Sequence, residues 1–187
     1  MYHFFHWFVV ISWVLSEVLL NRLFRSSGTD KTQADQRSLR TIWITIMIAL
    51  PLAHILSLYT SFPVSTSPTV MLAGLGMIIA GMLYRFTAIY TLGRYFTVDV
   101  AIRQDHRIVS RGMYRYMRHP SYLGSLISFL GNGFVLNNWV GLVMSFVPVL
   151  IAFIYRMNIE EELLLSNFGQ EYLDYKKKTW RLIPFVY

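Results

Sequence analysis

Two segments of the sequence place charged side chains directly beside hydrophobic runs. The first contains Arg118, His119 and Pro120, and the second contains Arg156 and Glu160, which are one helical turn apart and so share a helix face. A guanidinium offers a planar pair of donors to a carboxylate or phosphate, and a carboxylate can hold an ammonium group. Because charge at membrane depth is costly unless it has a partner, such groups are candidates for function. Facing each other, the two segments would form a cavity for a zwitterionic ligand.

The elements that must position these groups are membrane helices. Of the 187 residues, 55% are hydrophobic and only 14% are charged, which is unlike an ordinary soluble domain. A helix needs about 20 apolar residues to span a bilayer. We therefore expect an all-α, polytopic membrane helix bundle with five transmembrane helices, in the apolar runs 4–24, 41–60, 69–91, 122–136 and 140–155.

Small and turn-forming residues predict how these helices pack. Asn137 and Asn138 leave almost no connection between the last two runs, so those helices should form a tight antiparallel hairpin. Pro51 should kink the second helix without ending it. Small residues in the third run should allow a neighbouring helix to approach closely, and these are Gly74, Gly76, Ala80 and Gly81.

The basic residues predict the orientation of the bundle. Five lie in residues 21–40, six in residues 93–118, and four in the C-terminal segment. With five helices all of them fall on one side, which puts the N-terminus outside and the C-terminus in the cytoplasm. The net charge of +7 therefore indicates contact with membrane lipids and not with nucleic acid. The membrane would be the plasma (inner) membrane in a prokaryote and the endoplasmic reticulum in a eukaryote.

We expect one integral membrane domain over residues 1–187, with two functional parts. Residues 1–91 hold three N-terminal transmembrane helices. Residues 92–187 form a catalytic region with the last two transmembrane helices and a C-terminal cytoplasmic segment. The cofactor pocket should open on the cytoplasmic face, because both unusual segments lie there. The absence of cysteine excludes disulfides and thiolate metal sites, and no cluster of metal ligands is evident, so we expect no metal.

The stretch GMYRYMRHPSYLG, followed by EEELLLSNFGQEYLDYKKKTWRLIPF, resembles the isoprenylcysteine carboxyl methyltransferase family of integral membrane enzymes. The resemblance covers roughly residues 92–185 and implies that S-adenosylmethionine is the cofactor. It implies a substrate-facing Arg156. From the residue types we expect Arg118 and Arg181 to support the site, and Glu161 to orient Arg156 or Arg118. It implies a cofactor-binding set made of His106, Arg107, Ile108, Val109, Tyr114, His119, Pro120, Ser121, Tyr122 and Glu160. The connection before His106 is shorter than in eukaryotic members, which leaves a polar cofactor contact near Ala101 open.

The residue chemistry favours methylation of a carboxylate in a lipophilic, isoprenylcysteine-like substrate that enters from the bilayer. A carboxylate is already ionised at neutral pH and needs only positioning and desolvation, whereas an amine would need a base that the sequence does not single out. Glu160 would take the amino group of the cofactor, and His119 with backbone N–H groups would hold its polar oxygens. The ring of Tyr114 or Tyr122 would flank the adenine or the sulfonium.

Three other functions remain open at this point. One is an NADPH-dependent membrane reductase that acts on a sterol-like or other lipid double bond. Another is a phospholipid N-methyltransferase, and the third is a membrane scaffold without enzymatic activity. The three consecutive glutamates 160–162 argue against a polyanionic cofactor, and the pairing of arginine with glutamate argues against a scaffold.

Overall fold

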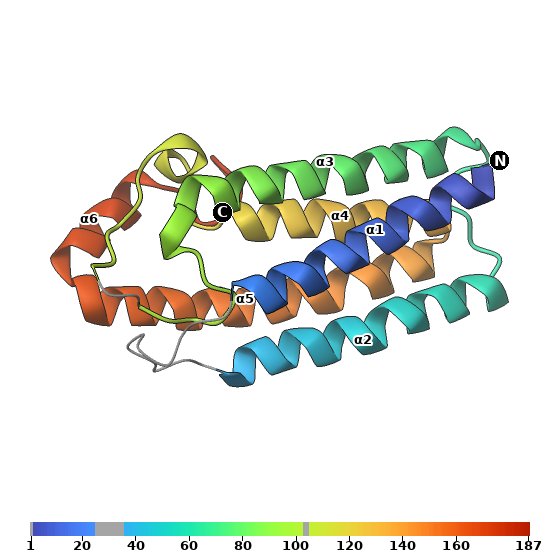
Figure 1. Cartoon of the computed structure of the whole chain (residues 1–187). Coiled ribbons are helices and arrows are strands. Elements are labelled where there is room, and N and C mark those ends of the chain that lie inside the picture. The colour runs from blue at the N-terminus through green and yellow to red at the C-terminus, as the bar shows by residue number, and fades with distance from the viewer. Residues whose placement is uncertain (1, 25–35, 103–104) are drawn as a thin grey trace.

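The structure, a computed structural model, describes residues 2–24, 36–102 and 105–187. Five long helices lie side by side, and a sixth, short helix crosses one end of the bundle (Figure 1). The helices are α1 (Tyr2–Leu23), α2 (Gln36–Tyr59), α3 (Thr69–Leu92), α4 (Pro120–Leu136), α5 (Trp139–Phe168) and α6 (Gln170–Lys178). Two short 3-10 segments, η1 (Gly93–Tyr95) and η2 (Gly112–Arg115), lie in the connection between α3 and α4.

The five long helices coincide with the five predicted apolar runs. The helix α5 extends beyond its apolar run 140–155, as the shared face of Arg156 and Glu160 requires, and continues to Phe168. It is followed by Gly169, whose φ of 52° is left-handed. The apolar pattern ends near residue 155, but the backbone hydrogen bonding of the helix continues to Phe168. As a result Arg156, Glu160 and Glu161 all lie on one continuous helix.

Three helices of the described residues are long and apolar enough to cross a membrane, over Arg37–Tyr59, Thr69–Tyr95 and Trp139–Phe168. The helix α4, with 17 residues, is shorter than these three. The helical architecture is therefore confirmed and supports a multi-pass membrane protein, while the count of five spans stays a prediction.

The helices α3 and α4 pack with their backbones in contact. A Cβ atom on Gly81 would lie 2.5 Å from the carbonyl oxygen of Gly124, and one on Gly74 would lie 2.6 Å from that of Gly131. The predicted close approach at Gly74 and Gly81 is confirmed, since the two are seven residues apart and share a helix face. The expectation was wrong for Gly76 and Ala80, which lie on other faces of α3 and are exposed.

The predicted hairpin of the last two helices is confirmed. The helix α4 ends at Asn137, a left-handed residue with φ 46°, and α5 begins directly after Asn138. The Asn138 side chain accepts hydrogen bonds from the backbone N–H groups of Val140 and Gly141, at 2.9 and 3.1 Å. This cap satisfies two of the free donors at the start of α5. Pro51 lies inside α2, which continues past it as expected.

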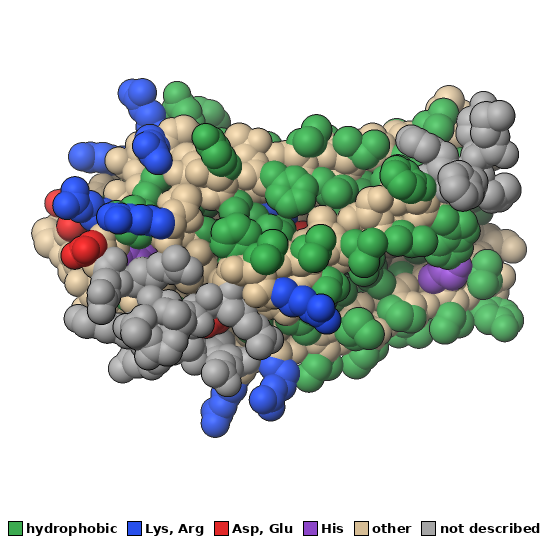
Figure 2. All heavy atoms as spheres, in the orientation of Figure 1, with side chains coloured by type: hydrophobic (Ala, Val, Ile, Leu, Met, Phe, Trp, Pro, Cys, Tyr) green, Lys and Arg blue, Asp and Glu red, His purple; other side chains and the backbone are tan. Residues whose placement is uncertain are grey.

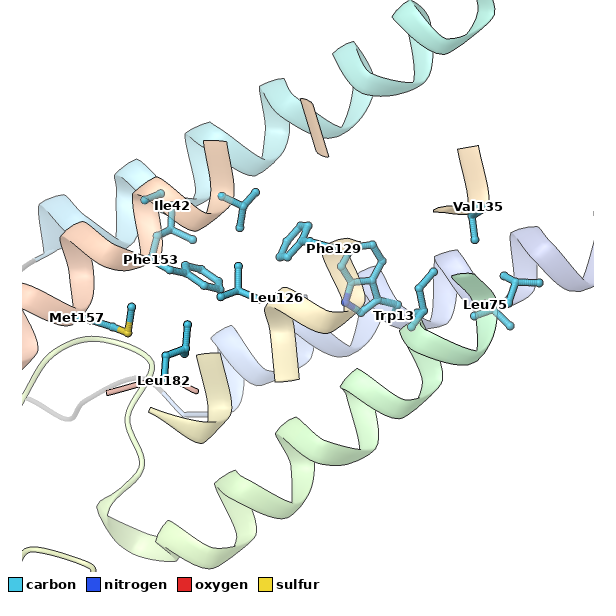
Figure 3. Packing of buried hydrophobic residues seen from close by; sticks show 13 residues of the cluster. Trp13, Ile42, Leu75, Leu126, Phe129, Val135, Phe153, Met157 and Leu182 are labelled. Carbon is cyan, nitrogen blue, oxygen red and sulfur yellow. The ribbon is translucent and has the colours of Figure 1, made fainter. Parts of the chain in front are cut away.

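The apolar core lies where all five long helices, α1 to α5, meet (Figure 3). The ring of Trp13 from α1 packs edge-on against Phe129 of α4, with ring centroids 4.9 Å apart. Phe129 in turn contacts Phe153 of α5. The aromatic pairs thus continue the core toward the end of the bundle that carries α6, where the polar side chains are found.

The C-terminal segment after α6 returns to the start of α4. The backbone N–H groups of Arg118 and His119 donate to the carbonyl oxygens of Trp180 and Arg181, at 2.8 and 3.1 Å. The N–H of Trp180 donates to the carbonyl oxygen of Tyr116 at 2.9 Å. Residues near the end of the chain therefore hold the segment that leads into α4.

Candidate active site

A cavity of about 150 Å³ opens between the helices at the end of the bundle that carries α6. Its lining comes from all six helices and from the connection between α3 and α4. One part of the wall is apolar and includes Ile42 and Trp43 of α2, Phe129 of α4 and Phe153 of α5. The other part is polar and includes nearly all of the residues that the sequence singles out.

All but two of the predicted site residues line this cavity. The two others are Pro120, which is buried as the first residue of α4, and Glu161, which lies behind His119. Ala101 also lines the cavity and contributes no polar side chain there. The residues brought together in the wall are His106, Arg107, Ile108, Val109, Tyr114, Arg118, His119, Ser121, Tyr122, Arg156 and Glu160.

The hydroxyl group of Tyr122 joins the two charged groups of α5. It donates a hydrogen bond to Glu160 Oε2 at 2.8 Å and accepts one from Arg156 Nε at 2.9 Å. Arg156 and Glu160 share a helix face, as their spacing predicts, and the phenol of α4 lies between them. Because α4 begins at Pro120, with its φ preset for the first turn, Tyr122 projects from a well-defined start of that helix.

Arg156 is held in one orientation by groups from three parts of the chain. Its side chain is buried, and Nη1 donates to Ser38 Oγ of α2 at 2.8 Å. Nη2 donates to the carbonyl oxygen of Val98 in the connection between α3 and α4. Sequence reasoning missed Ser38, because a single serine at the start of an apolar helix carries no signal of a partner 118 positions away.

Glu161 is the centre of a cluster of cations. Its Oε1 accepts hydrogen bonds from Arg118 Nε at 2.9 Å and from His119 Nε2 at 3.1 Å. Lys176 Nζ lies 3.1 Å from Oε2, and Arg181 Nε lies 3.3 Å from Oε1. The sequence left open whether Glu161 would orient Arg156 or Arg118, and the geometry pairs it with Arg118. The cluster ties α4, α5, α6 and the C-terminal segment together beside the cavity.

His119 presents its second ring nitrogen toward Glu160. Nδ1 is 3.9 Å from Glu160 Oε2, is buried, and has no hydrogen-bond partner among the described residues. The histidine ring is almost fully buried, whereas the Glu160 side chain is 32% exposed. A donor such as an ammonium group placed between them would satisfy both atoms.

Three tyrosines near this polar wall are neutral phenols. Burial raises the pKa of Tyr114, Tyr172 and Tyr175, and the negative charge of Glu160 raises that of Tyr114 further. The hydroxyl of Tyr175 donates to the carbonyl oxygen of Tyr114 at 2.8 Å, which ties α6 to η2. The buried hydroxyl of Tyr172 has no hydrogen-bond partner among the described residues.

The segment around His106 adds an aromatic wall. The His106 ring lies between Tyr95 and Phe168, with ring centroids 5.0 and 5.6 Å apart. Flat surfaces of this kind suit a planar heterocycle. Neither Tyr95 nor Phe168 was among the predicted site residues. Phe168 reaches the His106 ring only because α5 extends well beyond its apolar run.

Sequence reasoning also missed a charged pair at the other side of the cavity. Arg85 Nε of α3 lies 2.9 Å from Glu17 Oε1 of α1, and both residues line the cavity. No role was predicted for either residue from the sequence. The signal was that two apolar helices each carry one ionised residue, of opposite sign.

Residues 74–166 match the isoprenylcysteine carboxyl methyltransferase (ICMT) family. Over 115 residues the chain is 41% identical to protein-S-isoprenylcysteine O-methyltransferase B of Arabidopsis thaliana, covering 60% of this chain and 58% of that protein. Over 116 residues it is 35% identical to protein-S-isoprenylcysteine O-methyltransferase of Schizosaccharomyces pombe, covering 61% of this chain and 49% of that protein.

A solved structure is also similar to the chain. It is that of the eukaryotic intramembrane Ras methyltransferase ICMT, with a TM-score of 0.54 and 28% identity over 80% of this chain and 52% of that chain. This chain thus spans about half to three fifths of the length of the relatives it matches.

Proposed function

We propose that the protein is a membrane O-methyltransferase, which is supported by the match of residues 74–166 to the isoprenylcysteine carboxyl methyltransferase family. Its substrate is the carboxylate of a lipophilic, isoprenylcysteine-like molecule. Its methyl donor is S-adenosylmethionine. The observation that carries the proposal is the Tyr122 hydroxyl, which links Glu160 and Arg156 in the wall of one cavity.

The polar wall fits the cofactor. S-adenosylmethionine carries two cationic groups, and the wall offers Glu160 and the buried Nδ1 of His119, 3.9 Å apart, as acceptors for an ammonium group. The buried hydroxyl groups of Tyr172 and Ser125, neither with a hydrogen-bond partner among the described residues, supply further polar atoms. The rings of Tyr95 and His106, which both line the cavity, suit the adenine ring.

Arg156 would direct the reacting carboxylate. Bound in the cavity, S-adenosylmethionine supplies an electrophilic methyl group, whose transfer to a carboxylate oxygen leaves a neutral thioether and a neutral ester with no proton to remove. The guanidinium is buried and held by Tyr122, Ser38 and Val98, so it does not have to reorganise during the reaction. Its position next to Tyr122 places the carboxylate-binding charge beside the proposed cofactor wall.

The apolar part of the cavity would receive the lipophilic portion of the substrate. Ile42 and Trp43 of α2, with Phe129 and Phe153, form a hydrophobic wall that leads away from Arg156. A substrate of this kind partitions into the bilayer, so lateral entry between helices is the direct route. The soluble cofactor would enter from the opposite, polar end.

The proposed topology has five membrane spans, with the N-terminus outside and the C-terminus in the cytoplasm. Figure 2 supports it, because the blue lysine and arginine side chains of this face gather toward the end with α6, while the other end is mainly hydrophobic. The site would then open to the cytoplasm, where S-adenosylmethionine is made.

Two measurements test the proposed function. Isothermal calorimetry of the purified protein should show binding of S-adenosylhomocysteine, and binding of NADPH alone would contradict the proposal. A methyl-transfer assay against a panel of lipophilic carboxylates and matched lipophilic amines should show transfer to carboxylates. Transfer to amines alone would instead support an N-methyltransferase.

A further inference from the structure

The ion pair of Glu17 and Arg85 has no part in the chemistry proposed above. It lies between α1 and α3, and α3 is one of the candidate membrane spans. The two side chains are 20% and 13% exposed, and both residues line the cavity. In Figure 2 a red and a blue side chain are visible in a recess between α1 and α3, within an otherwise hydrophobic face. Ionised groups in such apolar surroundings cost free energy, and they often have a functional role.

The contact between the two groups is electrostatic and poorly aligned. Arg85 Nε is 2.9 Å from the Glu17 carboxylate, yet it has no hydrogen-bond partner among the described residues, because the N–H does not point at an acceptor. A different atom of the guanidinium, Nη1, donates to the carbonyl oxygen of Ser121 at 3.1 Å. Arg85 is thus fixed to the first turn of α4, while its attraction to Glu17 can be replaced by that of another anion.

The two helices that carry the ion pair, α1 and α3, differ in how extensively they pack against the rest of the bundle. A Cβ atom on Gly124 would lie 2.7 Å from the backbone nitrogen of Arg85, so the backbones of α3 and α4 are in contact at this point. The helix α3 packs against α4 along much of its length, whereas it meets α1 at fewer positions. Glu17 therefore lies on the less extensively packed side of the ion pair, and Arg85 lies on the tightly packed side.

The ion pair also lies close to the proposed reaction site. Ser121, which accepts from Arg85, is followed in α4 by Tyr122, whose hydroxyl accepts from Arg156. Two guanidinium groups therefore approach the first turn of α4, both within the lining of one cavity. An anion that contacts Arg85 would be a short distance along the cavity from Arg156.

We propose that Glu17 and Arg85 form an exchangeable gate for carboxylate-bearing lipids. The substrate carboxylate replaces Glu17 at Arg85 as it enters between α1 and α3, and then moves on to Arg156. The methyl ester product carries no charge that can compete with Glu17, so the ion pair re-forms behind it and favours its release. This inference rests on the proposed function, since it takes the lipophilic carboxylate as the ligand.

The test compares the binding of an acid and its ester to the full chain in lipid nanodiscs. The ligands are N-acetyl-S-farnesylcysteine and its methyl ester, and the variants are Arg85→Gln, Arg85→Lys and Glu17→Gln. Arg85→Gln should slow association of the acid roughly tenfold, because the entering carboxylate loses the cation that receives it, and should leave the association rate of the ester unchanged. Arg85→Lys should keep the faster association of the acid. Glu17→Gln should speed association of the acid about threefold, because it removes the competing carboxylate.

The possible outcomes separate the gate from the proposed function. If Arg85→Gln and Glu17→Gln change the association rates of the acid and the ester equally, the ion pair only fastens α1 to α3 and the gate is wrong. A wild-type protein that binds neither ligand, or both equally, also contradicts the gate. Preferential binding of the acid without any methyl transfer by the wild type would overturn the proposed function and leave the gate intact.

Discussion

Glu161 Oε1 lies 3.1 Å from Nε2 of His119, while Nδ1 on the other side of the same ring is 3.9 Å from Glu160. One buried carboxylate thus holds the histidine ring, and the other belongs to the cavity wall. The two ring nitrogens therefore face different carboxylates, and Nδ1 is the one directed toward the cavity wall. The expectation that His119 holds polar oxygens of the cofactor stays a prediction.

We predict that Glu161→Gln destabilises the protein and weakens cofactor binding. The change removes the charge that partners Arg118 and leaves its buried guanidinium uncompensated, at a cost of about 3 kcal/mol. Thermal unfolding in nanodiscs, with and without S-adenosylhomocysteine, measures both effects. Glu162→Gln, an exposed neighbour, is the matched control and should change neither. Equal behaviour of the two variants would show that the cluster has no structural role.

We predict that Tyr122→Phe lowers kcat about tenfold and leaves the fold intact. The lost hydroxyl is the link between Glu160 and Arg156, and losing one such hydrogen bond costs about 1.5 kcal/mol. The ring itself still packs against Phe153, at 5.1 Å between centroids. Initial rates of methyl transfer to a lipophilic carboxylate measure the effect, with Tyr116→Phe, at an exposed position, as the control. An unchanged rate would mean that the link is dispensable.

Arg156 and Glu160 should fail in different ways when changed. Arg156→Ala is expected to abolish turnover while the affinity for S-adenosylhomocysteine stays largely intact, and Glu160→Gln is expected to weaken that affinity. Calorimetry and initial rates distinguish the two effects. Arg156→Lys keeps the buried charge and serves as a second variant if Arg156→Ala does not fold. Equal loss of cofactor affinity in the arginine and glutamate variants would reassign their roles.

Ser38→Ala tests whether α2 takes part in the site. Ser38 is fully buried and accepts from Arg156 Nη1, so its loss leaves one guanidinium donor without that partner. We expect kcat to fall roughly fivefold, with the affinity for S-adenosylhomocysteine unchanged. Restoration of the rate by Ser38→Thr, which keeps the hydroxyl, would support positioning by hydrogen bonding. A rate equal to that of the wild type in Ser38→Ala would exclude α2 from this role.

The buried phenols predict how stability depends on pH. Burial raises the pKa of Tyr172 and Tyr175, whereas in the unfolded chain these groups ionise at a pKa of about 10. The contribution of these two tyrosines to the free energy of unfolding is therefore fully present below about pH 10. It is lost as the pH rises further, because only the unfolded state releases protons. Thermal unfolding between neutral and alkaline pH measures this loss. Tyr172→Phe should reduce the slope above about pH 10, and an unchanged slope would contradict the assignment.

The sequence predicts the helices well and the long-range contacts poorly. Apolar runs of membrane length and the Asn137–Asn138 turn specify the five long helices, because length and local backbone preference are properties of short segments. Ser38 and Glu17 could not be assigned, because their partners Arg156 and Arg85 are brought to them only by helix packing. Tyr95 and Phe168 were missed for the same reason, because the folding of the chain brings their rings to His106.

The predicted residues of the polar wall, from Tyr114 to Tyr122, lie together because they are close in the sequence and lead into a proline-started helix. What the sequence could not indicate is the support from the C-terminal segment. Backbone hydrogen bonds from Arg118 and His119 to residues 180 and 181 require the chain to turn back after α6. Nothing in the composition of that segment specifies such a return.

The uninterrupted course of α5 has a mechanical consequence. A helix of 30 residues is about 45 Å long, which exceeds the ~30 Å of a hydrocarbon core. Such a helix adjusts to bilayers of different thickness by tilting. Because Arg156, Glu160 and Glu161 lie on this one helix, a tilt of the helix moves all three together. The distance between Arg156, which would hold the substrate, and Glu160, which would hold the methyl donor, therefore does not depend on the thickness of the surrounding lipid.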